Sequence, residues 1–355
     1  MKILHTSDIH IDSPMNSRLP AIKVRERKRE LMLSLENLAK EAARQGCQAM
    51  IIAGDLFDSE NVSKKALDTV ISVISRYPSI TFFYLNGNHE GDVLASMSDL
   101  PENLLIFGDE WTYFASDGLT IAGRSGCEEN MFDSLCLNND TKNIVVLHGE
   151  LRDRSAFPDV IGRRDAENRG IDYLALGHYH KYSAEVLDGG TCAVYCGCPE
   201  GRGFDECGDM GYVIIDTEPS LSHTFVSFAK RQMRIVTVDI SGAADAADIA
   251  SRAEKALLGI SSSDIVRIEL VGRYPVGLWK DTEALRAKFE NRFYYTEVKD
   301  SSKIEIDPES YRNDRSLKGE FIRLVTSDGS LTDEQKERVI ACGIYALMGE
   351  NIYDR

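Results

Sequence analysis

Five short apolar runs, each ending in Asp, Asn or His, constrain most strongly what this chain can fold into. The runs are KILHTSD, AMIIAGD, ITFFYLNGN, NIVVLHG and DYLALGH, and all lie within residues 2–178. Short runs of this kind predict buried strands. Residues 23–44 and 62–76 lie between some of the runs and have helical periodicity. This alternation predicts a layered α/β domain.

After residue 180 the pattern changes to Gly-bounded β segments, namely TCAVYCG, MGYVIIDTE and HTFVSFA. We expect them to form an antiparallel half-sheet that completes the same domain. A boundary is expected near Lys230 and Arg231, which gives two domains, residues 1–229 and 230–355.

The second domain is smaller and has an α+β pattern. Strands are predicted in MRIVTVDI, DIVRIELVG and TEVKDSSKIEI, and helices over 243–258 and 282–293. Thr332 is expected to begin a final helix, with Gln335 as its capping-box partner.

The formal net charge of −16 limits what the surface as a whole can bind. It argues against a protein that grips nucleic acid over its entire surface, but it leaves room for a local basic strip. No stretch approaches the roughly 20 apolar residues of a membrane span, and the N-terminus has no signal-peptide core. We therefore expect a cytoplasmic protein without a membrane partner. Its eight cysteines are expected to be mostly reduced thiols.

Five polar motifs follow directly on the five apolar runs. They are Asp8-Ile9-His10, GDLFD (54–58), GNHE (87–90), His148-Gly149 and GHYH (177–180). Loops at the carboxyl ends of strands form the ligand crevice of a layered α/β sheet, so we expect these motifs to converge. Their mixture of oxygen and imidazole ligands suits Mn²⁺, Fe²⁺ or Zn²⁺ better than Ca²⁺. The number of ligands exceeds the need of one ion, which indicates two ions about 3.5–4 Å apart, bridged by one carboxylate.

The ordered set D-x-H, G-D-x-x-D, G-N-H-[DE], H and G-H-x-H resembles the calcineurin-like metallophosphoesterase superfamily over residues 1–228. The stretches LHTSDIHIDSP, GDLFDS and YCGCPEGRGFDECGDMGYVIID resemble the SbcD-type DNA repair exonucleases, especially their YhaO-like branch. The resemblance implies a layered α/β/β/α sandwich followed by a C-terminal α+β capping domain.

The resemblance also implies residue roles. The first metal ion would be held by Asp8, His10, Asp55 and His180. The second would be held by Asp55, Asn88, His148 and His178, with Asp55 bridging. His89 would act in catalysis, by protonating the leaving oxygen or by stabilising charge on the phosphate. Glu90 stands where the family usually has Asp, and it would support His89.

The leading hypothesis is a Mn²⁺-dependent phosphodiesterase that hydrolyses DNA with a metal-activated water, as an exonuclease and potentially also an endonuclease. The resemblance implies a homodimer and an SMC-like ATPase partner of the SbcC type. The chain ends soon after its final helix, whereas longer relatives carry further segments that dock on the ATPase, so this partnership is left open.

Two alternatives remain. The same dimetal centre would also suit small phosphodiesters or phosphomonoesters, which the acidic net charge favours. A non-catalytic subunit of a repair assembly is the third hypothesis, and its mark would be a missing ligand.

Several further residues receive expectations of their own. Arg152 lies in a basic group that includes residues 154, 163 and 164, and it is a candidate for contact with the DNA backbone. Arg202 is a candidate for contact with phosphate. His5 is expected to pack inside a strand, and His223 to be solvated in a loop. Asp58 is expected to support its loop.

Two groups of residues are expected to have no metal or DNA role. The basic stretch 23–30 is expected to be the solvated face of a helix. Four clustered cysteines are expected to be ordinary buried thiols rather than a zinc site, because their spacing lacks two paired motifs. They are Cys192, Cys196, Cys198 and Cys207.

Overall fold

The structure is a computed structural model, and it describes residues 1–355 except 16–18, 117, 155–158, 276–277, 306–307 and 348–355. The chain divides into two compact units, Met1–Gln232 and Met233–Arg355, which we call unit 1 and unit 2. The boundary expected from the sequence, between residues 229 and 230, lies close to this division.

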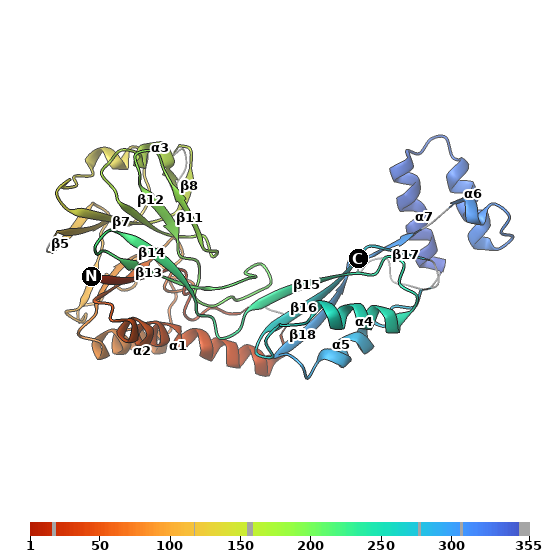
Figure 1. Ribbon diagram of the computed structural model, residues 1–355, viewed down its shortest axis with the longest axis horizontal. Coiled ribbons are helices and arrows are strands. Elements are labelled where there is room, and N and C mark those ends of the chain that lie inside the picture. The colour runs from red at the N-terminus through yellow and green to blue at the C-terminus, as the bar shows by residue number, and fades with distance from the viewer. Residues whose placement is uncertain (16–18, 117, 155–158, 276–277, 306–307, 348–355) are drawn as a thin grey trace. The chain divides into compact units, whose positions relative to one another are not determined.

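Unit 1 contains two six-stranded sheets (Figure 1). The first sheet has the order β14 (Ser222–Ser227), β13 (Gly211–Asp216), β1 (Lys2–Thr6), β2 (Ala49–Ala53), β3 (Thr81–Leu85) and β4 (Leu104–Ile106). The second sheet has the order β11 (Ser183–Val186), β12 (Cys192–Tyr195), β10 (Tyr173–Gly177), β7 (Lys142–His148), β6 (Leu119–Gly123) and β5 (Thr112–Ser116). A short separate pair joins β8 (Glu150–Arg152) and β9 (Val160–Gly162).

The two sheets pack face to face with helices on their outer faces. Ile51 of the first sheet and Val146 of the second belong to one buried apolar cluster between the sheets. The outer face of the first sheet is covered by α1 (Ala21–Gln45) and α2 (Lys64–Arg76) (Figure 1). The outer face of the second sheet packs against η1 (Met131–Ser134) and α3 (Arg163–Ala166). This arrangement confirms the predicted layered α/β/β/α sandwich.

Parallel pairing brings the predicted motifs to the same ends of the sheets. Strands β1, β2 and β3 run parallel, so the loops that follow them leave from one edge. Strands β7 and β10 are also parallel, and their register places His148 opposite Gly177, directly before His178. Both sheets therefore deliver polar loops at their carboxyl ends.

The expected antiparallel half-sheet is wrong as a single unit. Strand β12 belongs to the second sheet and runs parallel to β10, whereas β13 and β14 extend the first sheet in antiparallel fashion. The alternation within each segment predicts a strand, but it does not say which existing strand edge offers the hydrogen-bonding partner. Here the segments complete the edges of both sheets.

Unit 2 is an α+β unit, as predicted. Its three-stranded parallel sheet contains β15 (Met233–Asp239), β16 (Ile265–Val271) and β18 (Tyr295–Asp300). Its other elements are α4 (Ala246–Ala256), α5 (Thr282–Phe289), β17 (Arg273–Pro275), β19 (Lys303–Glu305), η2 (Pro308–Tyr311), α6 (Leu317–Ser327) and α7 (Asp333–Leu347). The sequence did not predict α6.

The predicted capping box at the start of α7 is confirmed. The Thr332 amide donates to Gln335 Oε1 over 2.8 Å, and the Gln335 amide donates to Thr332 Oγ1 over 3.3 Å. These reciprocal bonds satisfy two amides that the first helical turn leaves without intrahelical partners.

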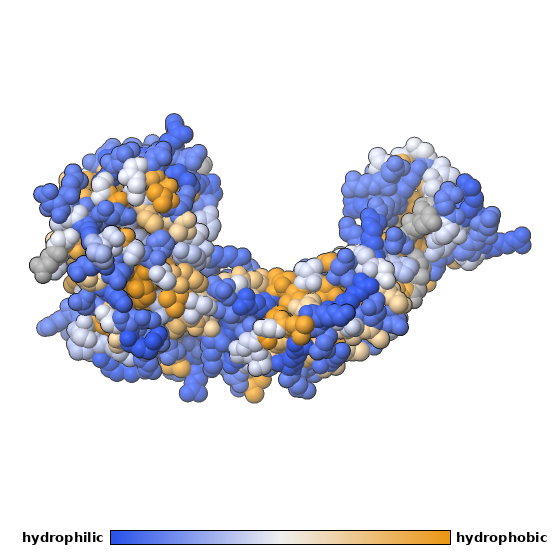
Figure 2. All heavy atoms as spheres, viewed as in Figure 1, coloured by the Kyte–Doolittle hydropathy of each residue, from blue (hydrophilic) through white to orange (hydrophobic). Residues whose placement is uncertain are grey.

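Apolar side chains gather over α4 and α5 in unit 2, as Figure 2 shows in orange. A hollow of about 270 Å³ lies between these helices, with Ile249, Leu270 and Leu285 in its wall and Lys280 and Lys288 among its lining. Within the described residues, no helix is both long enough and apolar enough to cross a membrane.

Candidate metal centre

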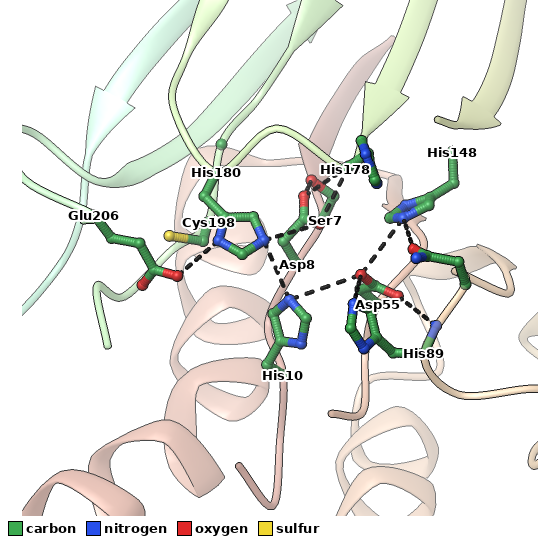
Figure 3. Close-up of polar contacts among 12 residues, drawn as sticks. Ser7, Asp8, His10, Asp55, His89, His148, His178, His180, Cys198 and Glu206 are labelled. Carbon is green, nitrogen blue, oxygen red and sulfur yellow. Dashed lines mark hydrogen bonds and ion pairs between the residues drawn. The ribbon is translucent and has the colours of Figure 1, made fainter. Parts of the chain in front are cut away.

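Side chains from all five predicted motifs meet at the carboxyl ends of the two sheets in unit 1 (Figure 3). Asp8, Asp55 and Asn88 follow β1, β2 and β3 of the first sheet. His148 ends β7, and His178 follows β10 of the second sheet. Segments far apart in sequence thus face one another across the mouth of the sandwich.

The first group of side chains surrounds one point. His10 Nε2 and His180 Nε2 are 3.3 Å apart, His180 Nε2 is 3.6 Å from Asp8 Oδ1, and His10 Nε2 is 3.7 Å from Asp55 Oδ2. Asp8, His10 and His180 offer ligand atoms that lie within 4.8 Å of one another. Two imidazole nitrogens facing each other beside two carboxylates suit a divalent cation.

A second group lies next to the first and shares Asp55 with it. Asp55 Oδ2 is 3.4 Å from His148 Nε2, which in turn is 3.0 Å from Asn88 Oδ1. The His178 ring lies against the His148 ring, with the two centroids 5.4 Å apart. The same oxygen of Asp55 therefore faces both groups, which is the geometry that a bridging carboxylate requires.

Electrostatics favour cations at this point. Asp8 and Asp55 are almost fully buried, and a buried carboxylate is costly without positive charge nearby. Burial alone would raise the pKa of Asp55, but the hydrogen bond and charge of His148 outweigh it and lower this pKa to about 2. Burial likewise opposes the charged form of His148, yet Asp55 and Asp8 raise the pKa of His148 to about 9. The donor set thus fits two divalent ions.

The backbone at several of these residues is strained. Asp8, His10 and Asp55 have φ values of 51°, 49° and 51°, and His178 has a φ of 103°. Non-glycine residues rarely adopt positive φ, and such conformations persist where the surrounding structure imposes them. The loops are therefore held in shapes that aim these side chains inward.

Two glycines are needed because the loops pass so close to one another. A Cβ added at Gly87 would lie 1.9 Å from Asp55 Oδ1. A Cβ added at Gly177 would lie 1.8 Å from the carbonyl oxygen of Ala53. Any larger residue at either position would displace a loop that carries the centre.

Comparison with known proteins identifies the fold family. Residues 1–182, just over half of the 355 residues, match the family model described as calcineurin-like phosphoesterase. The chain belongs to this family. The predicted superfamily is thereby confirmed, and the enzyme is a metallophosphoesterase, a hydrolase that acts on phosphoester bonds.

Three relatives show where the phosphoesterase lies within the family. It is 30% identical over 246 residues to the uncharacterized metallophosphoesterase YhaO of Bacillus subtilis, covering 63% of this chain and 60% of that protein. It is 27% identical over 231 residues to the DNA double-strand break repair protein Mre11 of Methanosarcina mazei, covering 61% and 36%. It is 26% identical over 272 residues to the SbcD subunit of the nuclease SbcCD of Escherichia coli, covering 61% and 65%. Each match spans less than two thirds of the relative's length, and the predicted relationship to SbcD-type and YhaO-like proteins is confirmed.

Solved structures also resemble the phosphoesterase. TT1561 of Thermus thermophilus has a TM-score of 0.43 and 15% identity over 63% of this chain and 98% of that one. A dimetal phosphatase from Danio rerio has a TM-score of 0.41 and 12% identity over 61% of this chain and 92% of that one. The family assignment rests on the sequence match alone.

His89 and Glu90 occupy different places in the phosphoesterase. The His89 side chain is 52% exposed, and its Nε2 lies 3.9 Å from Asp55 Oδ2. Glu90 is fully buried and accepts hydrogen bonds from the amides of Leu56, Phe57 and Gly87 over 3.1, 2.7 and 3.0 Å. Burial raises the pKa of Glu90 to about 7 although these amides favour the carboxylate. Glu90 therefore joins the GDLFD loop to the GNHE loop.

Sequence reasoning missed Glu206, which contacts a predicted ligand. Its Oε1 lies 2.6 Å from His180 Nδ1 and 2.9 Å from Arg202 Nη2. Burial opposes ionisation, but His180 and Arg202 outweigh it and lower the pKa of Glu206 to about 2. A signal for it does exist in the sequence, because Glu206 lies in GFDE, within the stretch that resembles the SbcD-type proteins.

The two arginines proposed for substrate contact lie in different surroundings. Arg152 is exposed and pairs with Glu150 over 2.6 Å, and Glu150 also accepts from the hydroxyl of Tyr179 in the GHYH motif. Arg202 is largely buried and contacts carboxylates through its three guanidinium nitrogens. Of the two, Arg152 is the one open to a ligand from solvent.

The expectations for His223 and for the basic stretch 23–30 are wrong in part. His223 lies in β14, not in a solvated loop, and its Nε2 is 3.2 Å from the hydroxyl of Tyr182. Arg27 is fully buried in α1, where it pairs with Glu30 and with Glu200. A helical face buries whichever of its residues meets a neighbouring loop, and charge alone does not reveal that contact.

The four clustered cysteines have different neighbours. The thiols of Cys192, Cys196 and Cys207 contact His223, Ser7 and the carbonyl of Phe204. Cys198 lies with Glu206 beside His180, in a group whose ligand atoms fall within 4.8 Å of one another. Burial raises the pKa of the Cys198 thiol well above its usual value, which disfavours the thiolate that metals prefer.

A second hollow, of about 350 Å³, borders the centre on the side of Asn88 and His148. Its acidic lining residues are Asp92, Asp109, Glu128 and Asp159. Because like charges repel, this side of the centre is unsuited to the phosphate of a substrate.

Proposed function

We propose that the phosphoesterase hydrolyses DNA phosphodiester bonds at two divalent cations, as an exonuclease with potential endonuclease activity in DNA repair. The observation that carries the proposal is the sharing of Asp55 Oδ2 between two groups of ligand atoms, at 3.7 Å from His10 Nε2 and 3.4 Å from His148 Nε2. The names of the relatives from Methanosarcina mazei and Escherichia coli support DNA as the substrate.

The proposed ligand sets are those expected from the sequence. One cation would lie among Asp8, His10, Asp55 and His180, and the other among Asp55, Asn88, His148 and His178. Bound there, the two cations would supply Lewis acidity that activates a water and neutralises charge on the phosphate. The oxygen and imidazole donors favour Mn²⁺, with Fe²⁺ and Zn²⁺ as alternatives.

His89 is proposed as the residue that moves a proton. Its imidazole is half exposed beside Asp55, whereas the imidazoles of His10 and His148 are buried. It can therefore meet a substrate that enters from solvent. A nucleoside alkoxide is a poor leaving group, and a histidine near its ordinary titration range can donate a proton to it. Glu90 would hold the loop that carries His89.

Arg152 is proposed to contact the DNA backbone at the rim of the centre. It is exposed, and through Glu150 it is linked to Tyr179 in the same motif as His178 and His180. Exposed ion pairs are weak, so a phosphate can displace Glu150 from Arg152 at small cost.

A homodimer and an SbcC-type ATPase partner remain part of the proposal. The relative from Escherichia coli is by its name one subunit of a nuclease, and the match covers 65% of it. A chromosomal DNA substrate agrees with the cytoplasmic location expected from the sequence. Hydrolysis of small phosphoesters is the competing function, and the acidic hollow beside the centre together with the net charge of −16 favours it.

The deciding experiment compares linear duplex DNA with a chromogenic small diester in the presence of Mn²⁺. We expect degradation of the DNA from its ends, and loss of that degradation in His89→Ala with both cations still bound. Hydrolysis of the small diester alone would favour the competing function. Unchanged repair in cells that carry His89→Ala would favour a non-catalytic subunit.

A further inference from the structure

The two predicted ligand sets differ in what lies behind their imidazoles. His180 Nδ1, which faces away from the centre, is 2.6 Å from Glu206 Oε1 (Figure 3). His10 Nδ1 is 3.1 Å from Asp58 Oδ1, a contact at ion-pair distance without hydrogen-bond alignment. His148 Nδ1 instead lies 2.9 Å from the backbone carbonyl of Ala53. Only the first set therefore depends on carboxylate side chains behind its histidines.

Arg202 connects the two carboxylates that lie behind the first set. Its Nη1 is 2.6 Å from Asp58 Oδ1, and its Nε and Nη2 are 3.2 and 2.9 Å from Glu206 Oε1. Its backbone amide also donates to Glu206 Oε2 over 2.5 Å. The planar fork of a guanidinium can bridge two carboxylates in fixed directions, which a lysine ammonium cannot do.

We propose that Arg202 is a positioning residue for one of the two cations: it bridges Asp58 and Glu206, and these hold His10 and His180 with their Nε2 atoms turned to the centre. The second set, backed by a carbonyl at His148, does not depend on this bridge. The inference rests on the proposed two-cation centre and assigns an asymmetry within it.

The physical reason is the control of ring orientation and tautomer. A carboxylate that accepts a proton from Nδ1 of a histidine leaves the lone pair on Nε2 directed at the metal. Removal of such a partner typically weakens metal binding about 10–100-fold. Arg202 also neutralises Glu206 and Asp58, which are 6% and 22% exposed, so the acids remain close to the histidines without gathering excess negative charge.

The test is a Mn²⁺ titration of the full chain, in which the free ion is followed by its electron paramagnetic resonance signal. The wild-type protein is expected to bind two ions. In Arg202→Gln and in Glu206→Gln, one binding step is expected to weaken about 10–100-fold while the other step stays unchanged. Arg202→Lys is expected to restore only part of the loss.

The matched control is Arg44→Gln. Arg44 donates from Nε and Nη2 to one oxygen of Glu41, the same pattern that Arg202 makes with Glu206, but on the exposed surface of α1. Both binding steps should be unchanged in this variant. Circular dichroism without metal checks that each variant is folded, and should Arg202→Gln fail to fold, Glu206→Gln carries the test.

Three results would overturn the assignment. One is an unchanged pair of binding steps in both variants. Another is equal weakening of both steps. The third is unchanged metal binding with a raised KM for DNA in Arg202→Gln, which would make Arg202 a substrate contact instead. A wild-type protein that binds no Mn²⁺ would refute the proposed function itself, and that outcome differs from all three.

Discussion

Burial sets the charge of single side chains inside the sandwich. His5 in β1 is fully buried, and its Nδ1 lies 3.0 Å from the hydroxyl of Tyr173. Burial lowers the pKa of His5 from 6.5 to about 3. The unfolded chain binds a proton at this residue below about pH 6.5, but the folded protein does so only near pH 3. The contribution of His5 to stability is therefore present above pH 6.5 and declines as the pH falls towards 3.

This linkage predicts the behaviour of His5→Gln. Gln keeps a polar atom for Tyr173 but does not titrate. Between pH 6 and pH 4 the wild-type free energy of unfolding should fall by about 2–3 kcal/mol more than that of the variant, since one pKa unit corresponds to about 1.4 kcal/mol. Urea unfolding at the two pH values measures this difference. Equal pH dependence in the two proteins would show that His5 is already charged in the fold.

At the residue scale the sequence predicted side chains that follow strands and missed those that meet across loops. Asp8, Asp55 and Asn88 were found because each follows an apolar run. Glu206 and Arg27 were missed or misplaced because their partners, His180 and Glu200, are distant in sequence. Patterning reveals the direction of a strand or helix, but it contains no information on which loop folds back onto it.

At the scale of the elements, the spacing between loops decides whether the centre can form. Gly87 lies in the loop after β3, where an added Cβ would be 1.9 Å from Asp55 Oδ1. Gly87→Ala should push Asp55 out of place and weaken Mn²⁺ binding at least about tenfold, because the shared carboxylate serves both ligand sets. The sheets themselves should stay intact.

Paramagnetic resonance titration and far-ultraviolet circular dichroism check the two parts of this prediction. Gly108→Ala is the matched control, because a Cβ added there meets no atom within 4 Å. Normal Mn²⁺ binding by Gly87→Ala would mean that the loop yields without moving Asp55.

The helix α1 depends on a buried ion pair. Arg27 Nη2 donates to Glu200 Oε2 over 3.1 Å and to the carbonyl of Gly201 over 2.8 Å. Without Arg27, the buried Glu200 carboxylate would keep its hydrogen bond from the amide of Lys230 but lose the guanidinium that neutralises it. Breaking one side of a buried pair typically costs about 3–5 kcal/mol.

Arg27→Met should therefore lower the free energy of unfolding by about 3–5 kcal/mol in urea titrations. Arg25→Met changes an exposed arginine of the same helix and should shift it by less than about 0.5 kcal/mol. Adding Glu200→Gln to Arg27→Met should recover part of the loss, because it removes the stranded charge. A loss in the double variant equal to the sum of the single losses would argue against the pair.

At the scale of the whole molecule, the order of strands in the sheets was beyond sequence reasoning. The alternation of strand and helix predicted the layers, since β1, β2 and β3 are joined through α1 and α2. The segments after β10 carry no such helices, so the sequence did not say that β12 and β13 join different sheets. Partner choice there depends on which edge is open after the layers have packed.

The two compact units have separate apolar cores. Three buried clusters lie wholly within residues 1–232, and one lies wholly within residues 233–355. All seven proposed metal ligands lie in unit 1. Because a domain with its own core can fold alone, the two units should unfold in separate calorimetric transitions, and only the transition of unit 1 should shift to higher temperature when Mn²⁺ is added.

The same reasoning predicts that residues 1–232 alone fold and bind two Mn²⁺ ions with the affinities of the full chain. The fragment should also hydrolyse a small diester at the rate of the full chain, because no proposed ligand or proton donor is lost. If unit 2 contributes to holding DNA, as the proposed capping role implies, the fragment should have a higher KM for duplex DNA and an unchanged kcat for the small diester. A fragment that folds but binds fewer than two ions would place part of the metal centre's support in unit 2 and contradict the independence of the two cores.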